Sequence, residues 1–302
     1  MNSETVGIIS ILMWELLIGI SPLVYKVINP AVPSSVIVAI RFGIAACVLL
    51  VWKLIEKPWQ KPHKTISWKV IGGLMFLGAF GSGFASLWNV MAIRNVGVIL
   101  ATLLTNLELP LGVLLGFFVL KEHITPVYLK IFMIISLGYI LLTVKNGIAL
   151  PGGGSYGLGI LVALGAAGIW GTCTLVGKKI LTTSISPVDV SLWRMVTGTA
   201  ANISIVLSQG QLTVSTFTHI ASIDWVYLFW LGAVTSGLGY VLYYKALHVL
   251  PVKKISLFFP ISTVVSVLLG VGSGEFPLMS QWLGAILIVG GITFLLIKKE
   301  HV

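Results

Sequence analysis

The chain has 302 residues, of which 57% are hydrophobic and 9% are charged, and its formal net charge is +10. A soluble domain carries about 25% charged residues, so this composition excludes a soluble globular protein and indicates a membrane protein. The basic residues lie at the ends of apolar runs and form no basic stripe with interleaved aromatic residues, which argues against nucleic-acid binding.

Apolar residues recur in runs of about 20, the length that an α-helix needs to cross a bilayer, whereas barrel strands would alternate over about ten residues. The predicted fold is therefore an all-α membrane protein with ten transmembrane helices. In chain order the predicted helices cover residues 6–27, 34–54, 69–93, 97–119, 126–144, 156–180, 187–208, 224–247, 252–273 and 278–297. The longest predicted linkers are 53–69, 145–156 and 209–223.

Lysine residues gather on one side of the membrane when these runs are placed in alternating directions. The other side receives only Lys26, Arg94 and Lys145. By the positive-inside bias the lysine-rich side is cytoplasmic. We therefore expect a multi-pass protein of the plasma (inner) membrane with both termini in the cytoplasm.

The two halves of the chain repeat each other at a nearly constant offset. Gly78, Ser82 and Gly83 recur 154 positions later as Gly232, Ser236 and Gly237, and Arg41 and Glu122 recur 153 positions later as Arg194 and Glu275. Each copy holds five predicted helices, and an odd number places the second copy in the opposite direction, as in many secondary transporters. The sequence thus predicts two inverted repeats, residues 1–150 and 151–302.

Several residues share their place in both halves. Each half opens with a Trp-containing helix (Trp14; Trp170), has a Pro followed by an Arg at its second helix (Pro33 and Arg41; Pro187 and Arg194), and has a Glu just after its fourth helix (Glu122; Glu275). This set resembles the EamA-type transporters of the drug/metabolite transporter superfamily over essentially the whole chain. The resemblance implies an alternating-access carrier with a central cavity, usually an exporter and often driven by protons.

Two features depart from the family pattern. The usual Pro in the fourth helix of each half is present as Pro260, but the first half reads Asn106-Leu107-Glu108-Leu109-Pro110. The usual Gly after the Trp is present as Gly171, but Glu15 replaces it in the first half.

Glu15 and Glu108 are the only acidic residues well inside the predicted helices. A charge at bilayer depth costs about 2.5 kcal/mol or more, so each should face a cavity or a partner. Because the repeat pairs them with small residues, Gly171 and Ser262, we expect both to point inward and to bind substrate or protons. The alternative is a structural role, with each carboxyl protonated and hydrogen-bonded inside the bundle.

Aromatic residues accompany these carboxyl groups along the predicted helices. The candidate substrate or proton site comprises Glu15, Glu108, Trp14, Asn106, Trp88, Trp170, Tyr240 and Tyr244. A carboxylate near aromatic faces suits an amine or a quaternary ammonium, through charge pairing and cation–π attraction. Positions at the membrane interface or against lipid are the other interpretation of these rings.

A second group is expected to be structural. Arg41 and Arg194 lie near helix ends, where snorkelling or pairing with helix termini explains them, and binding of a substrate carboxylate is the alternative. Glu122 and Glu275 are expected to cap neighbouring helix N-termini, with an ion pair in a gate as the alternative. Pro260 belongs with this structural group.

The function that the sequence predicts is secondary active transport of a small organic metabolite, such as an amino acid, an amine or a drug-like compound, by proton-coupled export. The alternatives are an uptake carrier for a cationic metabolite such as a quaternary amine and, in another class, a lipid flippase or an intramembrane enzyme. No catalytic, phosphate-binding or metal motif is present, so we expect no enzyme activity, metal or cofactor. The expected partners are the substrate, protons and the bilayer, without nucleic acid, for a monomer or weak homodimer.

Overall fold

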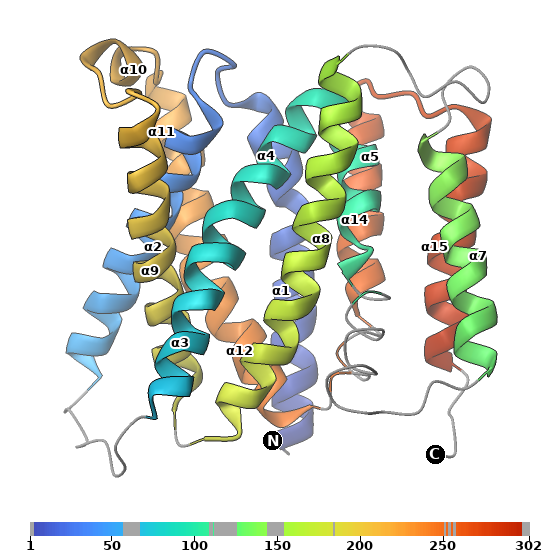
Figure 1. Ribbon diagram of the computed structural model, residues 1–302, viewed down its shortest axis with the longest axis horizontal. Coiled ribbons are helices and arrows are strands. Elements are labelled where there is room, and N and C mark those ends of the chain that lie inside the picture. The colour runs from blue at the N-terminus through green and yellow to red at the C-terminus, as the bar shows by residue number, and fades with distance from the viewer. Residues whose placement is uncertain are drawn as a thin grey trace.

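The computed structural model describes residues 3–56, 67–108, 111, 126–143, 154–183, 185–250, 252, 255 and 258–297, and these residues form helices and turns without any strand. The helices are α1 (Ser3–Val27), α2 (Ser34–Ile55), α3 (Trp68–Phe76), η1 (Leu77–Phe84), α4 (Ala85–Val96), α5 (Val98–Thr105), α7 (Pro126–Thr143), α8 (Gly154–Leu181), α9 (Pro187–Ser208), α10 (Val214–Thr218), α11 (Ser222–Phe229), η2 (Trp230–Leu238), α12 (Gly239–Val249), α14 (Phe259–Gly272) and α15 (Met279–Ile297) (Figure 1). This helical fold follows from the solvent, because a chain inside hydrocarbon must satisfy its backbone polar groups internally.

Six of these helical segments are long and apolar enough to span a bilayer. They are Ser3–Val27, Ser34–Ile55, Trp68–Val96, Gly154–Leu181, Pro187–Ser208 and Ser222–Val249, and two shorter apolar helices cover Ile261–Gly272 and Met279–Gly291. Large apolar side chains such as Leu54, Leu161 and Leu268 are exposed on the outside, as expected where lipid is the neighbour. The chain is a multi-pass membrane protein.

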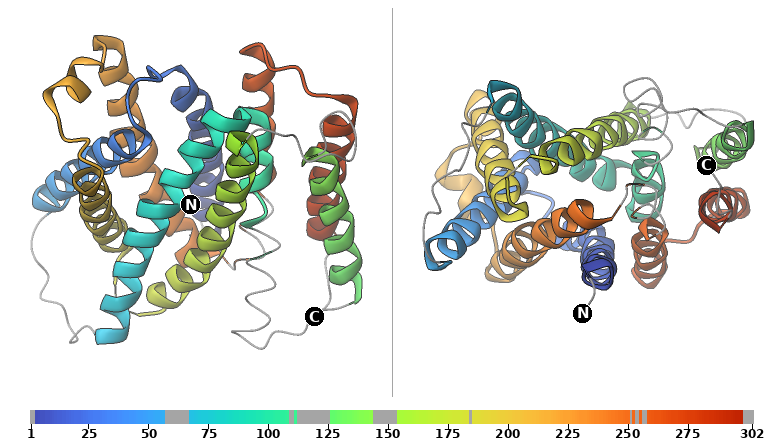
Figure 2. Two further views of the ribbon diagram at one scale, coloured as in Figure 1. Left: turned by 45° about the horizontal axis from the view of Figure 1, so that its top comes forward. Right: turned by 90° about the horizontal axis from the view of Figure 1, so that it is seen from below.

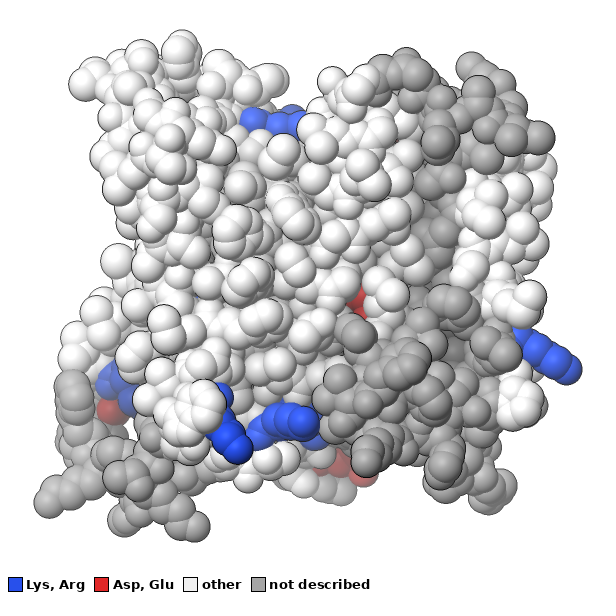
Figure 3. All heavy atoms as spheres, viewed as in Figure 1, with Lys and Arg blue, Asp and Glu red and all other residues white. Residues whose placement is uncertain are grey.

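The helices stand side by side and alternate in direction (Figure 1). α1 begins at the end of the bundle where α15 finishes, and α8 runs opposite to α1. α2 packs against α9 on one side of the bundle, whereas α7 and α15 pack on each other at the opposite edge (Figure 2). On the face that Figure 3 displays, Lys and Arg lie mostly toward the end where α1 begins, and the central band is almost free of charge.

Corresponding segments of the two halves make corresponding contacts. α9 packs on η1 and α2 packs on η2, while α4 packs on α8 and α12 packs on α1. At both crossings a glycine allows the backbones to approach: a Cβ added at Gly78 would lie 2.7 Å from the carbonyl oxygen of Arg194, and one at Gly232 would lie 2.8 Å from that of Arg41. Small residues therefore permit the tight helix packing that membranes favour.

Three local features differ from the sequence-based expectation. The third and eighth predicted helices contain π-helical segments, η1 and η2, at matching places. The predicted linker 209–223 holds a short helix, α10, which Thr213 caps through its side chain. The predicted helix 97–119 is interrupted, because α5 ends at Thr105 and Asn106 and Leu107 form a turn.

The fourth helix of each half has its boundary at the same place. α5 ends at Thr105, and α14 begins 154 positions later at Phe259, directly after a turn at Phe258. Pro260 lies in the first turn of α14. The N–H groups of a first turn have no partner within the helix, so a proline there costs no helical hydrogen bond. Broken helices at membrane depth are tolerated where they line a cavity.

Candidate functional site

A cavity of about 110 Å³, lined by polar and aromatic side chains, lies between the helices of both halves. Its wall comprises Trp14, Ile18, Ser21, Pro22, Tyr25, Arg41, Ser86, Asn89, Thr102, Thr105, Asn106, Glu108, Trp170, Cys173, Thr174, Arg194, Tyr240, Tyr243, Phe259, Ser262 and Ser266. These residues come from α1, α2, α4, α5, α8, α9, α12 and α14 and the turn after α5. The space exceeds what one water needs, so it can hold several waters or a small organic molecule.

Two carboxyl groups lie together on one side of this cavity. Glu108 is part of the wall, just beyond the end of α5, and makes no hydrogen bond or ion pair with the described residues. Glu15 is fully buried behind the wall, beside Ser262 and close enough to Glu108 for their charges to interact. Both of its carboxyl oxygens lack a hydrogen-bond partner. Because burying an unpartnered polar group is costly, this arrangement calls for a bound group or a mobile proton.

Tyrosine and tryptophan rings form the neighbouring wall. The Trp14 ring lies 4.7 Å from that of Tyr240 and 5.6 Å from that of Tyr243, measured between centroids. The Tyr243 hydroxyl is 3.0 Å from the Thr174 hydroxyl, and Trp170 donates from Nε1 to the carbonyl oxygen of Gly81 at 2.8 Å. These contacts fix the rings before any ligand arrives.

Three expected site residues do not reach the cavity wall. Glu15 lies behind it, and Tyr244 is fully buried next to it, where its hydroxyl accepts from Arg194. Trp88 packs against α8, since a Cβ at Gly165 would lie 2.5 Å from its ring. Asn106, by contrast, is on the wall and donates from Nδ2 to the Thr263 hydroxyl of α14.

Arg41 and Arg194 both line the cavity. Arg194 donates from Nε to the Ser82 hydroxyl at 3.0 Å and from Nη1 to the Tyr244 hydroxyl at 2.8 Å, while its guanidinium lies 4.4 Å from the Tyr240 ring centroid. Arg41 donates from Nε to the Ser236 hydroxyl. Each arginine of one half is therefore held by the serine of the other half, which ties α9 to η1 and α2 to η2.

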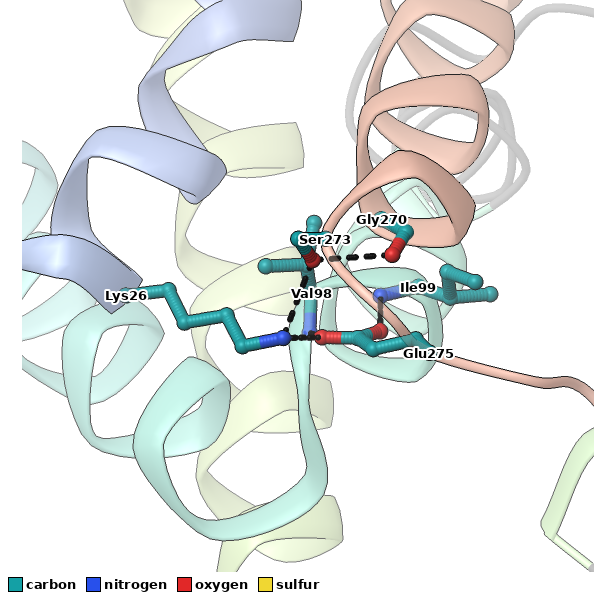
Figure 4. Close-up of polar contacts among 6 residues, drawn as sticks. All are labelled: Lys26, Val98, Ile99, Gly270, Ser273 and Glu275. Atoms are coloured by element: carbon teal, nitrogen blue, oxygen red, sulfur yellow. Dashed lines mark hydrogen bonds and ion pairs between the residues drawn. The ribbon is translucent and has the colours of Figure 1, made fainter.

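A separate polar cluster joins α1, α5 and the segment after α14 at one end of the bundle (Figure 4). The Glu275 carboxylate accepts from the backbone N–H groups of Val98 and Ile99 at 2.9 and 3.0 Å, and it pairs with the Lys26 ammonium at 2.9 Å. Lys26 also donates to the Ser273 hydroxyl at 3.0 Å. The carboxylate thus caps the N-terminus of α5, where free N–H groups and the helix dipole favour a negative charge.

One expected residue and the two cysteines remain. Glu122 lies outside the described residues. Cys173 is buried on the cavity wall and Cys47 is exposed, and both are free thiols. Among the described residues, no group of three or more His, Cys, Asp or Glu side chains is arranged to hold a metal ion.

Several hydroxyl groups and the amide of Asn89 on the wall were not among the predicted site residues. Ser86 and Asn89 are spaced by three on α4, Thr102 and Thr105 by three on α5, and Ser262 and Ser266 by four on α14. Residues at these spacings share one helix face. Polar pairs at helical spacing inside otherwise apolar runs were the signal that could have found them.

The fold and the cavity define a class: a multi-pass helical membrane protein with a cavity, lined by polar and aromatic side chains, between its two halves. The profile of the EamA-like transporter family matches residues 5–144 and again residues 157–297. The chain belongs to the EamA-like transporter family.

Two relatives agree with this assignment, and a solved structure shares the fold. The chain is similar to the uncharacterized transporter YyaM of Bacillus subtilis (strain 168), with 24% identity over 263 residues that cover 86% of this chain and 83% of the relative. It is also similar to the uncharacterized transporter YxxF of the same strain, with 26% identity over 243 residues, 79% of this chain and 74% of the relative. A crystal structure described only as that of a protein has the same fold, with a TM-score of 0.69 and 19% identity over 98% of each chain.

Proposed function

We propose that this protein is a secondary active transporter that exports a small organic metabolite by alternating access, coupled to protons. The observation that carries the proposal is the cavity with its two neighbouring carboxyl groups, Glu108 on the wall and Glu15 behind it. A carboxyl group without a hydrogen-bond partner can take up or release a proton without breaking an existing bond. Moving one charge through 100 mV is worth about 2.3 kcal/mol, enough to support a sizeable substrate gradient.

Alternating access follows from the proposed architecture of ten helices in two inverted repeats, residues 1–150 and 151–302. The family profile supports it by matching twice, and the opposite directions of α1 and α8 support it as well. The exchanged contacts Arg41 with Ser236 and Arg194 with Ser82 are what two copies facing each other would make. In the proposed cycle the halves rock about these contacts.

The cycle requires one end of the cavity to close while the other opens. The contacts of Glu275 with α5 and Lys26 close the end opposite to the one where α1 begins. In the proposed cycle these contacts break when the cavity opens on that side. We also propose that the chain lies in the plasma membrane with both termini in the cytoplasm. The end where α1 begins is then the cytoplasmic end, and in this structure it is the end at which the cavity would open.

Proteoliposomes test the proposed coupling. Purified protein is reconstituted with a pH-sensitive dye inside, and amino acids, amines and labelled metabolites are added in turn with and without a pH gradient. We expect a subset of compounds to move protons in the wild-type protein and Glu108→Gln to abolish that movement. Glu56→Gln is the matched control, since Glu56 is exposed at the end of α2. Wild-type proton movement and transport in both Glu15→Gln and Glu108→Gln would refute the proposal.

One observation favours a second candidate, uptake of a cationic metabolite. Trp14, Tyr240 and Tyr243 present aromatic faces to the cavity that also holds Glu108, and such rings attract ammonium groups. An importer of this kind would concentrate labelled amine in liposomes with an inside-negative potential, without a pH gradient. A proton-coupled exporter, in contrast, would accumulate its substrate inside the liposomes only when an imposed proton gradient drives protons out of them.

A further inference from the structure

Two buried arginines on the cavity wall have no carboxylate partner. Arg41 is 4% exposed and Arg194 is 3% exposed, and both belong to the wall. The ion pairs among the described residues are Lys26 with Glu275 and Lys53 with Asp189, so neither arginine takes part in one. Glu108 lies near enough to Arg194 for their charges to attract, but neither arginine forms an ion pair with a carboxylate of the described residues. A buried cation without a contacting counter-ion is costly, which makes these two groups an attractive site for an anion.

Both guanidinium groups keep donors free for a ligand. A guanidinium carries five N–H donors. Arg41 uses only Nε, in its bond to Ser236, and its terminal nitrogens are neither hydrogen-bonded nor sealed inside the protein. Arg194 uses one donor on each of Nε, Nη1 and Nη2, with the Nη2 bond to Tyr240 long at 3.4 Å, and two donors remain.

The geometry of the wall fixes these donors in advance. The guanidinium of Arg41 lies 5.4 Å from the Tyr25 ring centroid and 5.0 Å from that of Phe42, and the serine bond holds its Nε end. The two arginines are close enough for their charges to repel. A planar fork with free terminal donors matches the two oxygens of a carboxylate, and a carboxylate between the arginines would relieve their repulsion.

We propose that Arg41 and Arg194 form an anion subsite in the cavity, so that the transported molecule is a small organic compound with a carboxylate group. This inference rests on the proposed transport function. It makes both arginines binding residues in addition to their contacts with Ser236 and Ser82. Amines without an anionic group then bind poorly, although Glu108 is present in the same cavity.

Acetate is the probe, because it carries the proposed recognition group with almost no scaffold, and acetamide is its uncharged match. The protein is placed in nanodiscs of phosphatidylcholine alone, so that no anionic lipid head group competes, and binding is followed by calorimetry and by thermal unfolding at constant ionic strength. We expect acetate to bind in the millimolar range and to stabilise the protein, since a ligand of the folded form raises its melting temperature. Acetamide should do neither.

Variants separate binding from structural support. Arg41→Gln removes the charge but only one hydrogen bond, so it should weaken acetate binding about tenfold while remaining folded. Ser236→Ala removes the same hydrogen bond and leaves the guanidinium, so it should bind acetate nearly as wild type. Lys245→Gln is the matched control, because that cation is exposed and lies over the Trp52 ring, away from the wall.

Three results would overturn the subsite. Two of them are the absence of any difference between acetate and acetamide up to 200 mM, and unchanged acetate binding in Arg41→Gln. Stabilisation that appears only with phosphatidylglycerol in the nanodisc would assign the arginines to lipid instead and would also overturn it. These are binding measurements, so loss of transport with retained acetate binding would contradict the proposed function and not the subsite.

Discussion

Replacing Glu275 by alanine tests whether this carboxylate acts mainly as a helix cap. In the folded protein it accepts from the N–H groups of Val98 and Ile99 and pairs with Lys26. Gly97, which precedes α5, has a φ of 87°, and this conformation brings the first N–H groups of α5 toward the carboxylate. The substitution removes both hydrogen bonds and the ion pair in one step.

The two contributions differ in size. Hydrogen bonds to a charged group are worth about 1.5–3 kcal/mol each, and loss of a capping side chain costs about 0.5–2 kcal/mol. The Glu275 side chain is 19% exposed and the Lys26 side chain 35%, so the ion pair contributes at most about 1 kcal/mol. We therefore expect Glu275→Ala to lower the free energy of unfolding by about 2–4 kcal/mol, Glu275→Gln by roughly half of that and Lys26→Met by less than about 1 kcal/mol.

Unfolding in mixed micelles with increasing dodecyl sulfate, followed by circular dichroism, measures the three variants beside the wild type. The order of the midpoints decides the question, because only a cap makes the glutamate more important than the lysine. If Lys26→Met is as destabilising as Glu275→Ala, the ion pair supplies the stability and the reasoning from the cap is wrong.

Five further substitutions test the packing, a helix cap and a hydrogen bond to the backbone. Gly78→Ala should reduce the yield of folded protein in fluorescence-detected size exclusion, at a cost of about 1–3 kcal/mol for overpacking, whereas Gly72→Ala, which meets nothing within 4 Å, should not. Ser186→Ala should lower stability by about 1 kcal/mol because Ser186 caps α9, and Lys53→Met should change it by less than that because its ion pair is half exposed. Trp170→Phe should cost about 0.5–1.5 kcal/mol in micelle unfolding by deleting one hydrogen bond to the backbone, and a change below this range would mean that water replaces it.

The apolar runs predicted most of the helices, because a backbone inside hydrocarbon must satisfy its hydrogen bonds internally. Every predicted run contains at least part of a helix that the structure describes. The interruption after Thr105 was harder to predict, although the sequence carried a sign of it. Pro110 has no N–H to donate to the carbonyl of Asn106, so a continuous helix there lacks a bond.

The sequence predicted part of the cavity wall. The free-energy cost of burying a charge identifies which ionisable residues need a cavity or a partner, but it does not identify the residues around them. Glu108, Trp14 and Asn106 lie on the cavity wall, and Glu15 lies behind it. Arg41 was expected to be structural because it is near a helix end, and the structure gives it one hydrogen bond to Ser236 and a place on the cavity wall. The position of Arg41 along its helix does not determine the direction of its side chain. That direction depends on the residues of the other half that pack against it.

The two thiols give this protein a natural reporter of which side is open. Cys173 is sealed into the cavity wall, while Cys47 is exposed in the middle of α2, where lipid surrounds it. A water-soluble maleimide reacts with the thiolate form and so needs an aqueous route, which Cys47 lacks. Labelling of the unaltered chain, from the outside in intact cells or from the cytoplasmic side in inverted membrane vesicles, would therefore read the accessibility of the cavity without any engineered cysteine.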